Sequence, residues 1–376
     1  MDIFAIVLKL DRIISDIFSG KLPEKAELPE LLLRLSEDGQ LLESFSERAR
    51  NVSKRVFGNR VFLRGLIEIG NVCRNDCYYC GIRKSNKNLR RYVLSEDEIL
   101  SCCSYGYGEG FRTFVLQGGE NPAIGDDFLC GIIRKIKKDL PGSAVTLSLG
   151  ERGMDSFRKL RQAGADRYLL RHESADEEYF YRLHPHPGVE TGNFMDDAAV
   201  TNHARRMASL KMLKALGYQT GAGFMVGAPG QTLEHIAADL EFIAGFRPQM
   251  VGIGPYMPHP DTPLGRISDG FWTLRRKRMM TLGLLSILRM MDPCMLLPST
   301  TALNTLVPGG HYEGILAGAN VIMPNLSPVY ARKAYDLYSG KVADGGESRS
   351  GLNDLKMKLE AIGYAIDWSR GDYIKI

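Results

Sequence analysis

The chain has little of what several protein classes require. Its seven cysteines are an odd number and three share one loop, which argues against a disulfide framework and for a reducing compartment. The net charge of +4 is small for 376 residues, and no block of Lys and Arg suggests nucleic-acid binding. The most apolar stretch, residues 279–291, is interrupted by Arg289 and is too short to cross a bilayer. These absences predict a cytoplasmic protein with no nucleic-acid or membrane partner.

The amino terminus also lacks the features of a secretion signal. Asp2 introduces an acidic charge at once, and no small-residue cleavage site follows. Residues 3–14 instead have the apolar spacing of an amphipathic helix, and residues 31–42 repeat that spacing. Residues 1–57 are therefore expected to form a helical extension.

From residue 58 onward, strand-like and helix-like segments alternate. The expected strands cover residues 60–69, 113–116, 144–149, 167–170, 219–225, 250–254, 295–298 and 320–323. Ser95 and Glu98 form a capping box for the first intervening helix, and Gly164 and Gly217 are helix stops. This order predicts the α/β class, with residues 58–326 closed into a TIM-type (β/α)8 barrel and residues 327–376 as a tail that caps it. An open, doubly wound sheet is the alternative, because the seventh strand is weakly marked.

A tight cysteine loop follows the first expected strand. Cys73, Cys77 and Cys80 have the spacing C-x3-C-x2-C, and thiolates select soft metals. A structural zinc site needs four ligands, but no fourth Cys or His lies nearby in the sequence. Three ligands are what a [4Fe–4S] cluster with one open iron requires. We interpret the loop as a cluster site, with zinc or incidental thiols as the alternatives.

Polar residues or glycines follow every expected strand, at the end where a barrel gathers its chemistry. They are Gln117–Glu120, Ser148–Glu151, Arg171–Glu173, Met225–Gly227, residues 255–263, Ser299–Thr301 and Met323–Asn325. Some of these residues could have purely structural roles: the glycine pair at 118–119 could be a turn, Glu151 could pair with Arg171, and His172 alone is typical of a structural histidine. Taken together, the strand ends predict one shared cavity.

The cysteine loop, with Tyr79 before its third cysteine, resembles the radical S-adenosylmethionine (SAM) signature. Further segments extend the resemblance to the HydE family of [FeFe]-hydrogenase maturases: residues 88–92, 116–120, 146–151, 164–173, 221–227, 251–255, 258–263 and 319–325. The similarity runs from about residue 58 to 341, and biotin synthase and methylornithine synthase match these segments less well. Some family members hold a second iron–sulfur cluster through cysteines near the C-terminus. Here no cysteine follows Cys294, so the resemblance does not extend to that cluster.

The resemblance implies two cofactors, a [4Fe–4S] cluster and SAM. The reduced cluster is expected to cleave SAM into methionine and a 5′-deoxyadenosyl radical, with Cys73, Cys77 and Cys80 as cluster ligands. The residues that it implies for SAM binding are Tyr79, Gln117, Gly118, Gly119, Glu120, Ser148, Glu173, Arg206 and Met225. Those that it implies for the substrate are Arg171, Thr300, Thr301, Met323 and Arg332.

The family's role is assembly of the diiron subsite of the hydrogenase H-cluster. The resemblance therefore implies a small-molecule or small iron-complex substrate, companion maturases as partners, and a low-potential electron donor of the ferredoxin or flavodoxin type. Two other functions stay open at this point. One is a radical SAM mutase or sulfur-inserting enzyme acting on a small organic substrate, and the other is an iron–sulfur electron carrier that binds no SAM.

Overall fold

A computed structural model of the protein describes residues 12–17, 19, 21, 23, 27–185, 202–341 and 349–375. Six parallel strands follow one another around its centre in chain order. They are β2 (Gly65–Gly70), β3 (Thr113–Gly118), β4 (Ala144–Ser148), β5 (Arg167–Leu169), β6 (Gln219–Ala222) and β8 (Met250–Val251). Most of their side chains are buried, as expected of parallel strands covered by helices.

Two further segments close these strands into a barrel. Met250 of β8 forms a parallel bridge with Leu296, and Pro298 of the same segment bridges to Val321 in β10 (Val321–Ile322). The ring is completed where Leu66 of β2 bridges to Asn325, just after β10. The expected (β/α)8 barrel is confirmed and the open, doubly wound alternative is wrong. The sequence pattern of the seventh strand is weak because it includes Pro298, which has no N–H to donate to a neighbouring strand.

Three of the expected strands are divided in the structure. The segment 60–69 breaks at Arg64, so that β1 (Arg60–Leu63) pairs with β10 and with β11 (Ala365–Asp367), whereas β2 pairs with β3. The segments 219–225 and 250–254 likewise end in a separate parallel pair, β7 (Met225–Val226) and β9 (Gly254–Pro255). A continuous apolar run does not reveal such bends, because both halves of the strand are buried.

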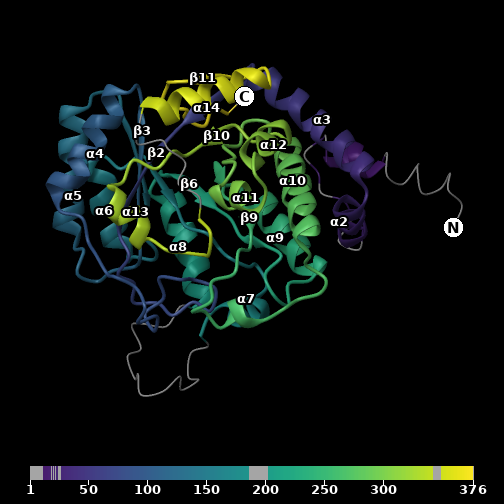
Figure 1. Ribbon diagram of the computed structural model, residues 1–376, viewed down its shortest axis with the longest axis horizontal. Helices are drawn as coiled ribbons and strands as arrows, with labels where there is room; N and C mark the ends of the chain where they lie inside the picture. Colours follow the sequence, from purple (N-terminus) through teal and green to yellow (C-terminus); the bar gives the residue numbers. More distant parts are fainter. Residues whose placement is uncertain are drawn as a thin grey trace, which may run out of the picture.

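Helices cover the outside of the barrel (Figure 1). Those that follow the barrel strands are α4 (Glu96–Gly108), α5 (Asp126–Asp139), α6 (Met154–Ala163), α7 (Glu177–Leu183), α8 (His203–Ala215), α9 (Leu233–Phe246), α10 (Leu274–Met291), α11 (Thr301–Leu306), α12 (Gly310–Leu316) and α13 (Val329–Ala334), with a 3-10 turn at Leu264–Arg266. The capping box of Ser95 and Glu98 is confirmed, and Gly164 ends α6 in the left-handed conformation. None of the described helices is long and apolar enough to cross a membrane.

Helices α2 (Leu28–Glu37) and α3 (Gly39–Phe57) pack against α10 on one flank of the barrel (Figure 1). Leu32, Leu35 and Phe45 are fully buried in this contact region, and Asp38 caps α3. The expected helix over residues 3–14 lies mostly outside the described residues, although Ile13 and Ile14 are buried in the core. The methionine-rich α10 is packed on all sides, as its apolar sequence predicts.

The end of the chain covers the amino-terminal ends of the strands. Helix α14 (Arg349–Ala361) leads into β11, which pairs in parallel with β1. Beyond it, Asp372 accepts a hydrogen bond at 2.6 Å from the fully buried guanidinium of Arg167, the first residue of β5. Burial alone raises the pKa of Asp372, but the charge and hydrogen bond of Arg167 outweigh it, so the pKa is lowered.

We expect Asp372→Asn to lower the free energy of unfolding at pH 7 by about 1–3 kcal/mol, because a buried guanidinium loses its charged partner. The folded-state pKa is lowered, so this contribution is present above the unfolded pKa of about 3.9 and is lost as pH falls through the folded value. Urea unfolding at pH 7 and pH 3 measures it. Asp354→Asn, in an exposed pair with Lys358, is the control and should change stability by less than about 1 kcal/mol. Equal losses in the two variants would contradict the assignment.

Candidate active site

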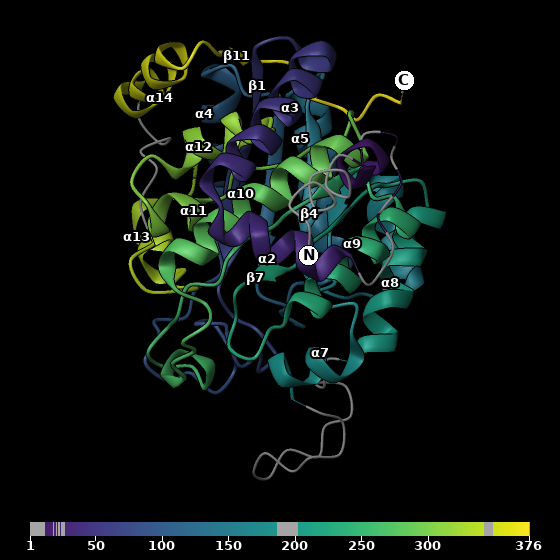
Figure 2. The same ribbon diagram turned by 90° about the vertical axis from the view of Figure 1, so that its right-hand side faces the viewer.

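The three motif cysteines lie at the carboxyl-terminal end of the barrel, in the loop that follows β2 (residues 71–80, the cysteine loop). In Figure 2 the loops after β2, in blue, lie at the lower end of the barrel, and α14 and β11, in yellow, lie at the upper end. The carboxyl ends of parallel strands share one face of a barrel, so the polar residues of the other strand ends meet the same mouth.

The thiols of the cysteine loop influence one another. Burial, followed by the charges of Cys80 and Cys73, raises the pKa of Cys77 well above its usual value. Burial and then Cys73 raise the pKa of Cys80 to about 12. The three sulfur atoms therefore occupy one desolvated region in which thiolates need a compensating positive charge. A metal centre supplies that charge, because it deprotonates the thiols that bind it.

The donor set of the cysteine loop suits an iron–sulfur cluster. Cys73, Cys77 and Cys80 lie in one short loop, and a [4Fe–4S] cluster takes each cysteine on a different iron. Gly119 also fits a crowded site, because a Cβ there would lie 2.9 Å from the Cβ of Cys73 and 2.3 Å from the carbonyl oxygen of Val72. The residues fit a [4Fe–4S] cluster.

Glu120 fixes the position of the cysteine loop. Its carboxylate accepts hydrogen bonds from Arg74 Nε at 2.7 Å, from Asn75 Nδ2 at 2.9 Å and from the backbone N–H of Glu151 at 3.0 Å. The carboxylate thus joins the end of β3, the cysteine loop and the end of β4. Sequence reasoning implied a role for Glu120 toward SAM and missed these protein contacts, because they depend on how three loops meet.

Gln117 and Ser148 lie deeper, in register on neighbouring strands. Gln117 of β3 is opposite Ser148 of β4 and also opposite Glu68 of β2. Glu68 is fully buried, contacts Lys341, and has a pKa raised by burial. Sequence reasoning did not name Glu68, although a carboxylate in an otherwise apolar strand was the available signal. Arg332 of α13 lies on the same side, since its charge acts on Glu68.

Tyr79 and Met225 meet in a small apolar cluster beside the cysteines, together with Tyr256 and Leu264. The Tyr79 hydroxyl lies 3.4 Å from Nε2 of His184, a buried residue that the sequence gave no reason to select. Burial and the positive charge of Arg206 lower the pKa of His184 to about 3, so its imidazole is neutral at physiological pH. Tyr79 and Met225, both implied for SAM binding, therefore lie in the same apolar cluster.

Charged side chains gather where β5 ends. Arg206 Nε donates to Glu151 Oε1 at 2.6 Å, and Arg205 Nε lies 3.3 Å from Glu151 Oε2. Arg171 Nε instead lies 3.7 Å from Glu173 Oε2. The expected pairing of Glu151 with Arg171 is therefore wrong, because α8 brings both of its arginines to Glu151.

Two residues of the same strand end have unusual backbone or packing. Glu173 has a φ of 65°, a conformation that residues other than glycine seldom adopt, and its backbone N–H donates to the Gly223 carbonyl at 3.0 Å. Such strain is found at functional sites when the surroundings enforce it. His172 is structural, as expected: Nε2 lies 3.2 Å from Asp239 Oδ1, and Nδ1 accepts from the Gly223 N–H.

Several buried polar atoms at this mouth form no hydrogen bond within the protein. Among the described residues these include Nε and Nη2 of Arg171, Oε2 of Glu173 and Oγ1 of Thr300. Each such atom costs free energy unless a ligand or water binds it. Thr300 occupies the N-cap position of α11 without a side-chain capping hydrogen bond, and Thr301 begins that helix. Met323 packs on the apolar cluster of Phe62, Met250, Leu296 and Val321, and the buried guanidinium of Arg64 donates to the Met250 sulfur at 3.2 Å.

Comparisons with known proteins agree with this site. The radical SAM superfamily model matches residues 67–243. A protein from Thermotoga maritima named [FeFe] hydrogenase maturase subunit HydE is 42% identical over 300 residues, which cover 80% of each chain. The chain belongs to the HydE family of radical SAM enzymes.

More distant relatives also match most of the chain. A 3-methylornithine synthase from Methanosarcina acetivorans is 29% identical, with 87% of each chain covered. The crystal structure of methylornithine synthase (PylB) superimposes with a TM-score of 0.77 at 25% identity, over 94% of this chain and 96% of that one. The expectation of a radical SAM enzyme is confirmed, and the electron-carrier and zinc alternatives are not.

As a radical SAM enzyme, this HydE-family protein uses a [4Fe–4S] cluster and SAM. When bound and reduced, the cluster supplies the electron that cleaves a carbon–sulfur bond of SAM. Cys73, Cys77 and Cys80 would hold the cluster, while Glu120 fixes their loop and charged side chains line the mouth. The barrel wall excludes water from the reaction space.

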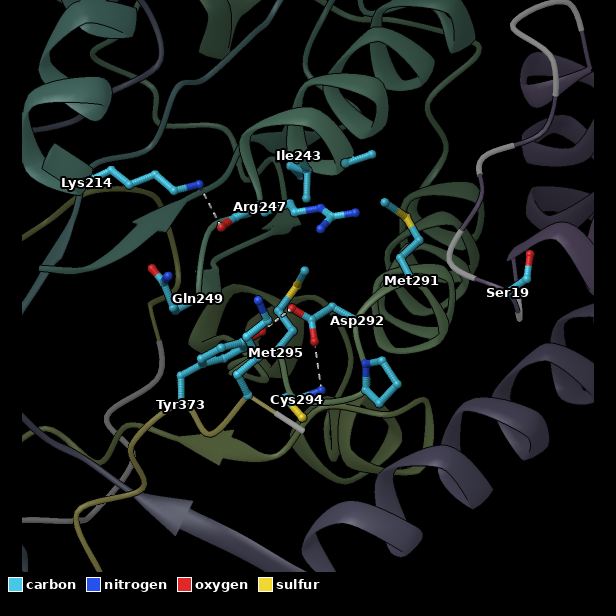
Figure 3. A pocket seen from close by; sticks show the side chains of 13 residues that line it. Ser19, Lys214, Ile243, Arg247, Gln249, Met291, Asp292, Cys294, Met295 and Tyr373 are labelled. Carbon is cyan, nitrogen blue, oxygen red and sulfur yellow. Dashed lines mark hydrogen bonds between the residues drawn. The ribbon is translucent and has the colours of Figure 1, made fainter. Parts of the chain in front are cut away.

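A second hollow lies at the opposite end of the barrel (Figure 3). It has a volume of about 630 Å³ and is lined partly by Gln249 and Met295, which stand at the starts of their strands. Asp292 in its wall accepts hydrogen bonds from the Tyr373 hydroxyl at 3.1 Å and from the backbone N–H of Cys294 at 2.9 Å. Cys294 therefore lies at the opposite end of the barrel from the cysteine loop.

We expect Glu120→Ala to lower the iron content and the rate of SAM cleavage at least tenfold while the protein stays folded, because Arg74 and Asn75 lose the carboxylate that holds the cysteine loop. Iron analysis and the visible spectrum after anaerobic reconstitution measure the effect. Asp155→Ala removes a carboxylate from an exposed pair on α6 and is the control. Full iron and normal activity in Glu120→Ala would show that the loop does not need this anchor.

Proposed function

We propose that this enzyme acts in assembly of the diiron subsite of the [FeFe]-hydrogenase H-cluster, using the 5′-deoxyadenosyl radical obtained from SAM. The support is the 42% identity with a protein named as an [FeFe] hydrogenase maturase subunit, across four fifths of both chains. The observation that carries the proposal is the barrel mouth, where buried polar atoms of Arg171, Glu173 and Thr300 that form no hydrogen bond lie at strand ends on the same side of the barrel as the three cysteines.

In this proposal the cysteine side of the mouth binds SAM. Cys73, Cys77 and Cys80 hold the cluster, and backbone groups of Gly118 and Gly119 face the methionyl end of SAM. Further residues assigned to SAM are Tyr79, Gln117, Glu120, Ser148, Glu173, Arg206 and Met225. Arg206 uses its Nε–H for Glu151 and one Nη1–H for the Arg171 carbonyl, so three N–H groups of its guanidinium remain for the SAM carboxylate.

The substrate occupies the interior beyond SAM. Its proposed contacts are Arg171, Thr300, Thr301, Met323 and Arg332. The two arginines and the threonine hydroxyls suit a small anionic ligand, and the apolar cluster below Met323 limits how deep it lies. A small iron complex with anionic ligands matches this environment.

The partners follow from the same proposal. Companion hydrogenase maturases supply the substrate and accept the product, and a low-potential donor of the ferredoxin or flavodoxin type reduces the cluster in the cytoplasm. We also propose the division into a helical extension at 1–57, a catalytic barrel at 58–326 and a tail at 327–376. The packing of α2 and α3 on α10, and the pairing of β11 with β1, support it.

A second candidate function is a radical SAM mutase or sulfur-inserting enzyme on a small organic substrate. The similarity to methylornithine synthase, with a TM-score of 0.77, favours it. Sequence identity to that type is 29%, against 42% for the maturase, which favours the maturase. An activation assay separates the two functions. The purified protein is added to extracts that lack it, together with a hydrogenase that lacks its diiron subsite, and only a maturase should restore hydrogenase activity.

For the cluster, we expect Cys77→Ala to lose most of its iron and all SAM cleavage, because one of the three proposed cysteine ligands of the cluster is removed. The wild type should bind about four irons per chain and release 5′-deoxyadenosine in the presence of SAM and dithionite without oxygen. Cys130→Ala, on the buried face of α5, is the control and should keep both. Full iron and activity in Cys77→Ala would exclude the proposed ligand set.

For the mouth, we expect Glu173→Ala and Arg206→Ala to keep their iron but to bind SAM at least tenfold more weakly, since a desolvated charged contact is worth about 2–5 kcal/mol. Arg171→Ala should keep SAM affinity and 5′-deoxyadenosine release but lose hydrogenase activation. Titrating SAM against the electron paramagnetic resonance signal of the reduced cluster measures affinity. Unchanged SAM affinity in both of the first variants would remove them from the SAM site.

A further inference from the structure

The segment that follows the third cysteine folds back against the cysteine loop (residues 81–94, the return segment). Val93 forms an antiparallel bridge with Gly70, and the Leu94 N–H donates to the Ile69 carbonyl at 2.8 Å. The guanidinium of Arg91 donates to the carbonyl oxygens of Asn71 at 2.6 Å and Ile82 at 2.8 Å. These bonds hold the return segment rigidly beside the cluster ligands.

The return segment, the cysteine loop and helix α13 form one continuous surface. The side-chain amide of Asn71, two residues before Cys73, donates to the Arg90 carbonyl at 2.9 Å and to the Ala334 carbonyl at 2.7 Å. Beyond the third cysteine, the Gly81 N–H donates to the Leu337 carbonyl at 2.9 Å. A protein docked on this surface would therefore lie next to the cysteine loop.

Three large apolar side chains are exposed on this surface. Val93, Val329 and Tyr330 are 44%, 55% and 44% exposed. The ring of Tyr330 packs edge-on against Tyr92 at 6.0 Å, and its hydroxyl donates to Glu98 Oε1 at 2.5 Å. Large apolar side chains that are exposed together beside a functional site are typical of an interaction surface.

Exposed positive charges lie on the return segment and on α13, the elements that also carry these apolar residues. Lys87, Arg90 and Lys333 are exposed, and none forms an ion pair within the part of the chain that the structure describes. Arg90 lies near Tyr330: burial and Glu98 raise the pKa of Tyr330 to about 12, and the charge of Arg90 acts in the opposite direction.

Several other charges of the region are paired within the protein. Arg83 forms a bidentate pair with Asp76, at 2.8 and 2.6 Å. Tyr330 also contacts the acidic first turn of α4, where Glu98 caps its helix and Glu96 contacts Lys135, while Asp97 adds a further negative charge. The exposed positive charges are therefore carried by the return segment and α13, and the negative charges by α4.

We propose that Val93, Val329 and Tyr330, rimmed by Lys87, Arg90 and Lys333, form the docking surface for an acidic, ferredoxin-type one-electron carrier protein. The inference rests on the proposed function, in which one electron must reach the cluster for SAM to be cleaved. The carrier is oxidised by one electron, which enters the cluster through the adjacent cysteine loop. A small apolar centre with a charged rim fits the limited interfaces of transient electron-transfer complexes, and the basic rim selects an acidic partner.

The test compares two reductants on one set of variants. The charge-reversal variant Lys87→Glu/Arg90→Glu/Lys333→Glu should form 5′-deoxyadenosine at least tenfold more slowly when the reductant is a reduced, acidic 2[4Fe–4S] ferredoxin. With dithionite, which needs no docking surface, it should match the wild type. Its affinity for that ferredoxin, measured by titration calorimetry at low salt, should fall at least tenfold, and added salt should weaken wild-type binding.

The control variant is Arg48→Glu/Lys138→Glu/Lys211→Glu, which changes the net charge equally at exposed positions on α3, α5 and α8. It should behave as wild type with both reductants. Loss of ferredoxin-driven activity in both variants, equal loss with dithionite, or unchanged ferredoxin affinity would each overturn the docking surface. A wild type that cleaves no SAM even with dithionite would instead refute the proposed function, and the affinity measurement would still decide the surface.

Discussion

The backbone pairing between Leu66 and the segment after β10 is the contact on which the rest of the structure depends. The Leu66 N–H donates to the Pro324 carbonyl at 2.9 Å, and the Leu326 N–H donates to the Leu66 carbonyl at 2.7 Å. These bonds join the first strand of the barrel to the last and so bring distant parts of the chain to one mouth. With an open sheet, Thr300 and Arg332 would lie at an edge far from the cysteine loop. Closure of the barrel is therefore what turns scattered strand ends into one site.

Within that mouth, charges are arranged around groups that only a ligand can satisfy. Glu120 holds the cysteine loop and Glu151 holds the arginines of α8, so these carboxylates are already paired in the protein. Arg171 and Glu173 are different, because they keep buried polar atoms that form no hydrogen bond within the protein. The hydrogen-bonded groups give the site its shape, and the atoms without a hydrogen bond, together with the strained backbone of Glu173, favour a polar ligand.

The surface outside the mouth is also connected to the cysteine loop. Asn71 joins the return segment and α13 to the cysteine loop, so that exposed residues on both elements stand beside the cluster ligands. In the proposal, the electron therefore enters beside the same loop that carries Cys73, Cys77 and Cys80. The hollow lined by Gln249 and Met295 lies at the opposite end of the barrel.

The sequence by itself predicted the alternating α/β order, the three cysteines as candidate cluster ligands and the polar strand ends, and it left a closed barrel and an open sheet as alternatives. Apolar periodicity and glycine stops are local properties, and the C-x3-C-x2-C spacing is a constraint within one loop, so each can be read from neighbouring residues. The bend at Arg64, the role of Glu120, the presence of His184 beside Tyr79 and the exchange of partners between Glu151 and Arg171 were decided only by the tertiary structure. Each of these depends on which side chains from distant segments reach the same point. That convergence is set by closure of the ring and by the packing of α8 against it, which no local pattern encodes.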